Sequence, residues 1–154
     1  MLKRIAHFHS FGINGNAKTV DIGLAILRIM TGLALATVFE KFMPRDGIWG
    51  PQQWFIDDVE AMGFPLPLVF AWAAVCAEFF GGIAMMAGIG TRSAALLNVI
   101  VTFTAAFVYH EGAVAESALT ATVFLTMTLT ILFAGPGRFS LDGLLLKRNE
   151  HTTI

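Results

Sequence analysis

The chain has 154 residues, of which 56% are hydrophobic and 14% are charged, and its formal net charge is −1. Soluble domains carry about 25% charged residues, so a mean hydropathy of +0.70 excludes an ordinary soluble domain and indicates a polytopic membrane protein of one domain. The near-zero charge gives no indication of nucleic-acid binding, and the single cysteine, Cys76, excludes an internal disulfide or a C-x-x-C redox pair.

The first 21 residues form a mixed segment with several basic and turn-forming residues. We see no cleavable signal peptide, because the first apolar run starts near Ile22, has the length of a full span and lacks an A-x-A-like site. His7 and His9 form an H-x-H pair whose side chains diverge on a helix. A metal site there would need further ligands, so we expect an ordinary exposed pair and no metal.

Four apolar runs follow, and each is long enough, or nearly so, to cross a bilayer. About 20 residues at 1.5 Å per residue span a hydrocarbon core of about 30 Å, and the third run is slightly short. Short loops between such helices favour an antiparallel bundle. We therefore predict an all-α fold, an integral-membrane four-helix bundle, with spans at Ile22–Phe42, Leu66–Ile89, Ala94–Tyr109 and Ser117–Ala134.

The longest loop, Arg45–Pro65, contains the segment PQQWFIDDVEAMG, which predicts a short amphipathic helix. Pro51 suits the first turn of that helix and Gly63 suits its C-terminal cap. One face would be apolar, and the acidic residues would be mostly solvated. A helix of this kind lies on the membrane surface. Its apolar face would consist of Trp54, Phe55, Val59 and Met62.

Lysine and arginine gather on one side of the predicted topology. That side holds Lys3, Arg4, Lys18, Arg92, Arg138, Lys147 and Arg148. The other side holds Arg45, with Lys41 at its edge. The positive-inside rule therefore places both termini in the cytoplasm and the amphipathic helix on the outer face.

Small and polar residues recur at helical spacing in the spans. Ala73, Ala77 and Gly81 lie four residues apart, a pattern that lets helices approach closely. Two polar stripes should point into the bundle, where interhelical hydrogen bonding is their simplest role. They are Thr122, Thr126 and Thr130 in the fourth span and Asn98, Thr102 and Tyr109 in the third.

The second span carries one carboxylate, Glu78, near its middle. A charge at the bilayer centre costs about 2.5–3.5 kcal/mol, so such residues face other helices and pair. Arg28 lies in the first third of the first span, and its side chain is long enough to reach Glu78 if the two helices are adjacent. We predict an Arg28–Glu78 pair, direct or through water. The pair could be structural and fix helix registry, or it could belong to a proton relay or to an anion or quinone site.

A second candidate site lies near the outer surface, where several polar and aromatic residues should share one height. Carboxylate, ammonium, phenol, imidazole and indole groups offer the donors and flat faces that a quinone headgroup needs, and an imidazole can titrate near neutral pH. For Glu40 and Lys41 the alternative is that they simply extend from a helix end toward water, as snorkelling side chains do. The candidate residues are Glu40, Lys41, Trp54, Trp72, Tyr109 and His110.

No cofactor is identifiable in the chain. Bis-histidine haem ligation needs two histidines at matching depth inside the spans, and no span has one away from its end, so a haem is not expected from this chain alone. No glycine fingerprint in a strand–helix context indicates a flavin or nicotinamide. A quinone remains the ligand to consider, and Cys76 is expected to be a small apolar filler.

Five sequence blocks occur in a characteristic order. They are Ile26-Leu27-Arg28-Ile29, Phe39-Glu40-Lys41-Phe42, Gly63-Phe64-Pro65, AEFFGGIAMMAGIGTR at Ala77–Arg92 and GPGRFSLDGLL at Gly135–Leu145. Together they resemble the DoxX family of small four-helix membrane proteins, over about Ile22–Leu146. The resemblance implies a cytoplasmic N-terminal segment (1–21), a four-span DoxX-like membrane domain (22–146) and a cytoplasmic tail (147–154).

The resemblance also implies a setting in a bacterial or archaeal cytoplasmic membrane. The family takes its name from a membrane subunit associated with thiosulfate:quinone oxidoreductase and terminal oxidase systems, and other members resemble partners in thiol or oxidative-stress complexes. Arg28, Lys41, Glu78 and Thr91 match the family pattern without an implied catalytic role. The resemblance further matches residues that we expect to be structural: Gly81, Gly82, Arg92, Gly135, Pro136, Gly137 and Asp142.

Three functions are compatible with these patterns. The first is a subunit of a quinone-linked redox system, for thiosulfate, sulfur or oxidative stress, without a recognisable redox centre of its own. The second is a non-catalytic scaffold or assembly subunit, and the third is a small oligomeric transporter. In each case the expected partners are the lipid bilayer and other membrane subunits or further copies of this chain, and not nucleic acid.

Overall fold

The computed structural model describes residues 17–37, 41, 50–115 and 117–150, and it is helical with no strand among them. The H-x-H pair at the N-terminus and Glu40 lie outside the described residues. The elements are α2 (Ala17–Ala36), α3 (Gln53–Ala61), α4 (Pro67–Ala87), α5 (Thr91–Phe103), the π-helix η2 (Thr104–Tyr109), α6 (Leu119–Ala134) and α7 (Leu141–Glu150).

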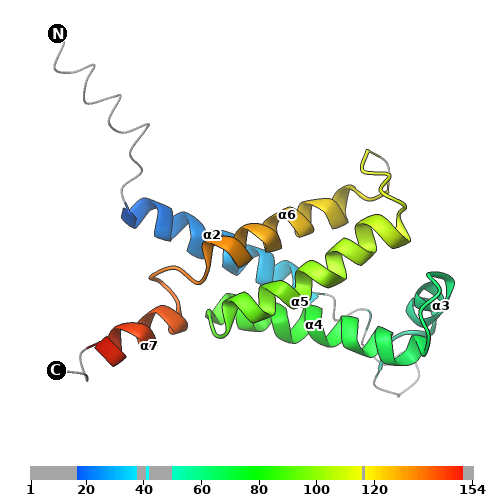
Figure 1. Cartoon of the computed structure of the whole chain (residues 1–154), viewed down its shortest axis with the longest axis horizontal. Helices are drawn as coiled ribbons and strands as arrows, with labels where there is room; N and C mark the ends of the chain where they lie inside the picture. Colours follow the sequence, from blue (N-terminus) through cyan, green and yellow to red (C-terminus); the bar gives the residue numbers. More distant parts are fainter. Residues whose placement is uncertain (1–16, 38–40, 42–49, 116, 151–154) are drawn as a thin grey trace, which may run out of the picture.

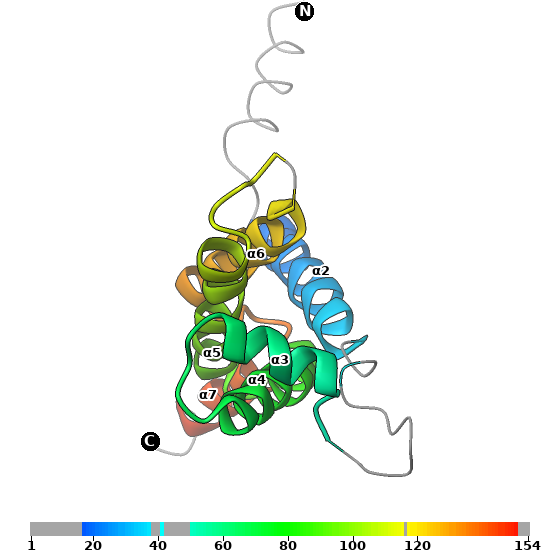
Figure 2. The ribbon, with the colours of Figure 1, turned by 90° about the vertical axis from the view of Figure 1, so that its right-hand side faces the viewer.

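Four of these helices pack side by side around a common core. Helix α2 packs on α4, α4 on α5, α5 on α6 and α6 on α2, with successive helices running in opposite directions (Figure 1). Seen from one end, α3 lies across the bundle over α4 (Figure 2). Helix α7 lies at the opposite end from α3 (Figure 1). The predicted all-α architecture is confirmed, and the amphipathic segment folds as the short helix α3.

Three helical segments have the length and composition to cross a membrane: Lys18–Ala36, Pro67–Ala87 and Thr91–Tyr109. Helix α6 is apolar but has only 16 residues, which at 1.5 Å per residue span about 24 Å of a core of about 30 Å. The fourth span therefore stays a prediction. The last described element is the ten-residue helix α7, which runs from the end of the predicted membrane domain (22–146) into the predicted tail (147–154).

The bundle core is small and apolar. It consists of Leu35, Met85, Ala94, Ala95 and Ile131, one or two from each of the four packed helices. Many large apolar side chains point outward instead, among them Ile26, Phe80 and Phe133. An outward apolar surface is the pattern expected of helices that face lipid. The threonine stripe of α6 was expected to point inward, but Thr126 and Thr130 are exposed and bond to their own helix.

Glycines set the distance between α2 and α4. A Cβ atom built on Gly82 would lie 2.6 Å from the carbonyl oxygen of Gly32 and 2.9 Å from the amide nitrogen of Ala36. A Cβ on Gly32 would lie 2.4 Å from the carbonyl oxygen of Gly82. The two backbones are therefore in direct contact, as at the small-residue interfaces of membrane helices. On another face of α4, Gly81 leaves room for the buried side chain of Asn98.

Asp142 fastens α7 to the turn between α4 and α5. Its carboxylate accepts hydrogen bonds from the amides of Gly90 and Thr91, both at 3.0 Å, and from the Thr91 hydroxyl at 3.1 Å. Its own amide donates to the carbonyl of Gly88 at 2.8 Å. The otherwise unpaired amides at the start of α5 are thereby satisfied by a residue that lies about 50 positions later in the sequence.

This cap should make stability depend on acid pH. Burial raises the pKa of the Asp142 carboxyl, but hydrogen bonds from Thr91 and Gly90 and the nearby Arg28 guanidinium outweigh it and leave the pKa below its ordinary value of 3.8. A carboxyl with a lowered pKa in the folded state adds stability above about pH 4 and loses that contribution as the pH falls further. Asp142→Asn should cost about 1 kcal/mol at pH 7 and flatten the fall in Tm below pH 4. An equal acid dependence in Asp142→Asn and in the exposed control Asp57→Asn would contradict this assignment.

Candidate functional site

A pocket of about 440 Å³ lies between α3, α4 and the α5–η2 helix. Most of its wall is apolar, with contributions from Phe55, Val59, Phe64, Phe70, Ile100 and Val101. The polar side chains that line it are Lys41, Asp58, Glu78, Thr104, Tyr109 and His110. This volume and this mixture of an apolar wall with a few polar groups are those of small-molecule sites, which typically enclose about 300–1,000 Å³. We call it the α3 pocket.

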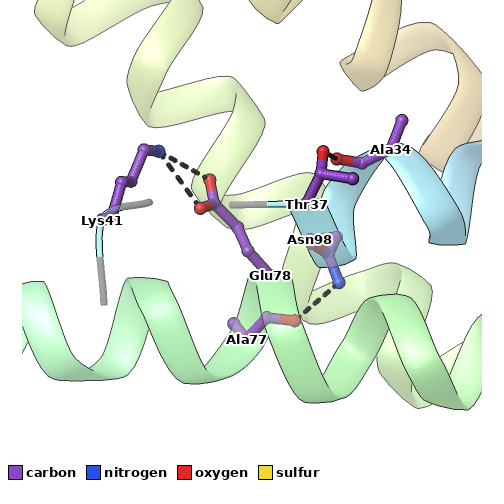
Figure 3. Close-up of polar contacts among 6 residues, drawn as sticks. All are labelled: Ala34, Thr37, Lys41, Ala77, Glu78 and Asn98. Atoms are coloured by element: carbon purple, nitrogen blue, oxygen red, sulfur yellow. Dashed lines mark hydrogen bonds and ion pairs between the residues drawn. The ribbon is translucent and has the colours of Figure 1, made fainter. Parts of the chain in front are cut away.

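Glu78 and Lys41 form an ion pair in the α3 pocket. The Lys41 ammonium lies 3.1 Å from Oε2 and 3.4 Å from Oε1 of Glu78 (Figure 3). The Glu78 side chain is 9% exposed and that of Lys41 is 28% exposed. Because the carboxylate is so deeply buried, its partner is essential to offset the loss of hydration.

Lys41 also holds α3 in place. Its ammonium lies 4.9 Å from the centre of the Phe55 ring on α3, close enough for a cation–π interaction. Its carbonyl accepts a hydrogen bond from the amide of Gln52, directly before α3, at 2.9 Å. Lys41 therefore connects the carboxylate of α4 to the helix that covers the pocket.

The predicted Arg28–Glu78 pair is not formed. Side chains in an α-helix lean toward its N-terminus, and α2 and α4 run in opposite directions. Arg28 therefore reaches toward the α7 end of the bundle, whereas Glu78 reaches toward the α3 end. Arg28 and Glu78 would be within reach of each other only if both side chains extended sideways from their helices.

Arg28 instead binds the segment between α6 and α7. Its guanidinium donates to the carbonyl oxygens of Pro136 and Phe139, the latter at 2.7 Å. The residue is 2% exposed and packs against Gly88, where a Cβ atom would lie 2.7 Å from Nη1. Arg28 is therefore a buried residue that binds the α6–α7 segment at the α7 end, far from the α3 pocket. Gly135 and Gly137, at φ of +81° and +69°, give this segment the turns that bring its carbonyls to Arg28.

The outer candidate residues are only partly brought together. Lys41, Trp54, Tyr109 and His110 all line the α3 pocket. Trp72 does not line it; its indole lies beside Gly50, where a Cβ atom would be 3.2 Å from the ring. Arg92, which was expected to be structural and on the opposite side, lies with its guanidinium against Gly135 at the α7 end.

A change in helix type sets the place of Tyr109 and His110. The hydroxyls of Thr102 and Thr104 donate to the carbonyls of Asn98 and Ile100, four residues earlier, at 2.7 and 2.9 Å. Such bonds compete with the regular helical ladder and bend helices, and the chain continues as the wider π-helix η2. Short π-helical segments are frequent at functional sites. The rings of Tyr109 and His110 then meet edge to face, with centres 4.7 Å apart.

Three residues of this arrangement were missed by the sequence reasoning. Asp58 was expected to be solvated, but it lines the α3 pocket and interacts with the Tyr109 hydroxyl. Phe55 was predicted to lie on the apolar face of α3, but its cation–π contact with Lys41 was not predicted. Gly32 was overlooked, although its spacing of four from Ala36 repeats the small-residue pattern that identified Gly81.

The α3 pocket presents an apolar wall with hydrogen-bond donors at two places. One is the Lys41 ammonium, and the other is the His110 ring beside Tyr109. In the part of the chain that the structure describes, no three His, Cys, Asp or Glu side chains are grouped so as to hold a metal ion. The polar side chains of the pocket offer hydrogen bonding and proton exchange within an apolar wall.

Comparison with known proteins agrees with this architecture. The DoxX family model matches residues 23–111, more than half of the chain. The inner membrane protein YqjF of Escherichia coli (strain K12) is 33% identical over 138 residues, a match that covers 85% of this chain and 98% of YqjF. No solved structure gives a significant match. With its apolar helices and this relative, the chain is an integral membrane protein and belongs to the DoxX family.

Proposed function

We propose that this protein is the membrane subunit of a quinone-linked redox system and that the α3 pocket binds the quinone headgroup. The observation that carries the proposal is an apolar pocket, inside a membrane bundle, with an ion pair in its wall and aromatic and imidazole groups beside it. The expected setting is a cytoplasmic membrane with the α3 end outward, because Lys18, Arg92 and Arg138 lie at the α7 end.

The position of the pocket supports a lipid-soluble ligand. Its wall includes Phe70, Leu97 and Ile100, which are about half exposed on the outer surface of the bundle. These residues belong to α4 and α5, two of the segments able to cross a membrane. A ligand dissolved in the bilayer could therefore reach the pocket sideways, between the helices, with its isoprenoid tail left in the lipid.

The polar groups of the pocket fit the two carbonyl oxygens of a quinone ring. The Lys41 ammonium can donate to one oxygen while its other hydrogens stay on Glu78. The His110 ring can donate to the other, and the Phe55, Phe64 and Phe70 rings offer flat surfaces. A bound quinone would supply two-electron, two-proton redox chemistry, and a partner subunit with a flavin or haem would supply the electrons.

Tryptophan fluorescence tests the proposal, because Trp54 lines the pocket and Trp72 does not. Titration of the detergent-purified protein with a short-chain quinone should quench its emission with saturation. Trp54→Phe should remove most of the saturable quenching, whereas Trp72→Phe should retain it. His110→Ala should weaken binding about tenfold, as expected when one good hydrogen bond in an apolar site is lost.

Quenching that is linear and equal in all variants would show only partition of the quinone into the micelle. That result would overturn the proposal and leave a scaffold or assembly role as the better account of the fold.

A further inference from the structure

We propose that Glu78 determines which ligands the α3 pocket accepts: by neutralising Lys41 it selects uncharged carbonyl compounds and rejects lipophilic anions. The inference rests on the proposed function, because it concerns the ligand of the same pocket. It assigns the buried carboxylate a role in specificity in addition to its structural role as the partner of Lys41.

The geometry makes Glu78 and Lys41 a single neutral unit. Both carboxylate oxygens lie within 3.4 Å of the Lys41 ammonium, and the Glu78 side chain is 9% exposed. The Phe55 ring, 4.9 Å from the same ammonium, occupies another side of it. A ligand oxygen that approaches Lys41 therefore meets an ammonium whose charge is already balanced.

An anion would meet the same ammonium with the Glu78 carboxylate 3.1 Å from it, so repulsion by the carboxylate offsets attraction by the ammonium. In an apolar wall, charges interact more strongly than in water, and like charges that face each other oppose binding. A neutral carbonyl oxygen avoids this repulsion and still gains a hydrogen bond from Lys41. Removal of the Glu78 charge would leave a lone ammonium in the pocket, and an anion would then be the favoured ligand.

The other charged and titratable groups that face the pocket do not produce the same effect. Asp58, on α3, is only partly buried and interacts with the Tyr109 hydroxyl. His110, at the end of η2, lies beside Tyr109. Because Asp58 is closer to solvent, its charge is better screened than that of Glu78. Asp58→Asn is therefore the control for Glu78→Gln, because both substitutions remove one negative charge but Asp58 is less deeply buried.

The experiment compares two ligands of nearly equal shape. One is 2-methyl-1,4-naphthoquinone, which is neutral, and the other is 2-hydroxy-1,4-naphthoquinone, which is ionised at pH 7.5. The ratio of their Kd values is measured by fluorescence titration in detergent for the wild type, Glu78→Gln and Asp58→Asn. Glutamine keeps the shape and one acceptor of Glu78. We expect Glu78→Gln to shift the ratio toward the anion by about tenfold or more, and Asp58→Asn to shift it less than about threefold.

A second variant isolates the cause. In the double variant Lys41→Gln/Glu78→Gln no charge remains in the pair, so the gain in anion affinity should disappear even though Glu78 is still absent. A ratio in Glu78→Gln that matches the wild type, with quinone binding retained, would overturn this inference and leave the proposed function standing. Failure of the wild type to bind either ligand would overturn the proposed function itself.

Discussion

Gly82→Val should prevent the bundle from folding, or should lower its free energy of unfolding by about 3 kcal/mol or more. A Cβ atom at this position would already lie 2.6 Å from the carbonyl oxygen of Gly32 and 2.9 Å from the amide of Ala36. Both neighbours are helix backbone, which cannot rotate away as a side chain can. Relief would require α2 and α4 to separate. These two helices contribute Leu35 and Met85 to the bundle core.

The matched control for this variant is Gly23→Val in α2. Nothing lies within 4 Å of a Cβ atom built on Gly23, so the same substitution should leave the protein folded. Size-exclusion chromatography of a fluorescent fusion in mild detergent would measure both. A sharp, monodisperse peak for Gly82→Val with an unchanged Tm would contradict the direct backbone contact between α2 and α4.

Lys41→Met should destabilise the protein by about 2 kcal/mol. Removal of the ammonium leaves the Glu78 carboxylate 9% exposed and without its partner, and it also removes the contact with the Phe55 ring. The cost stays below that of breaking a fully buried pair, because the Lys41 side chain is 28% exposed and the carboxyl can take up a proton.

The double variant Lys41→Met/Glu78→Met should recover most of that stability, because two apolar side chains replace the pair in an apolar wall. Thermal unfolding of the wild type, both single variants and the double variant gives the coupling energy directly. The structure predicts that the effects of the two single variants are strongly non-additive. Additive effects would mean that the ion pair does not form in the membrane protein.

The sequence was sufficient to predict the long elements of the fold. An apolar run of about 20 residues has few alternatives to a membrane helix. Gly63 follows the C-cap of α3, as its stop signal predicted, whereas Pro51 lies before the N-cap Gln52 and not in the first turn. The predicted span Leu66–Ile89 differs from α4 by one or two residues at each end. The small-residue spacing that contains Gly81 also identified a face of α4 that packs closely.

The partners of the buried charges could not be read from depth alone. Whether Arg28 or Lys41 meets Glu78 depends on the direction in which each side chain leans, and this direction reverses between antiparallel helices. The π-helix could not be predicted either, because threonine hydroxyls make the same bonds to the helix ladder at Thr102 and Thr104 as at Thr126 and Thr130 of α6, which stays an α-helix. Asp58 was missed for a related reason, since the placement of α3 over the pocket follows from tertiary packing.

The central claim is that the α3 pocket, with its Lys41–Glu78 pair, binds a quinone. The most direct test is the isoprenoid quinone that copurifies with the protein from native membranes in mild detergent, measured by mass spectrometry of the lipid extract per mole of protein. The wild type should retain quinone, and the folded double variant Lys41→Met/Glu78→Met should retain at least about tenfold less, since each tenfold corresponds to the loss of about one strong hydrogen bond. Equal quinone content in the two proteins, at equal Tm, would contradict the claim.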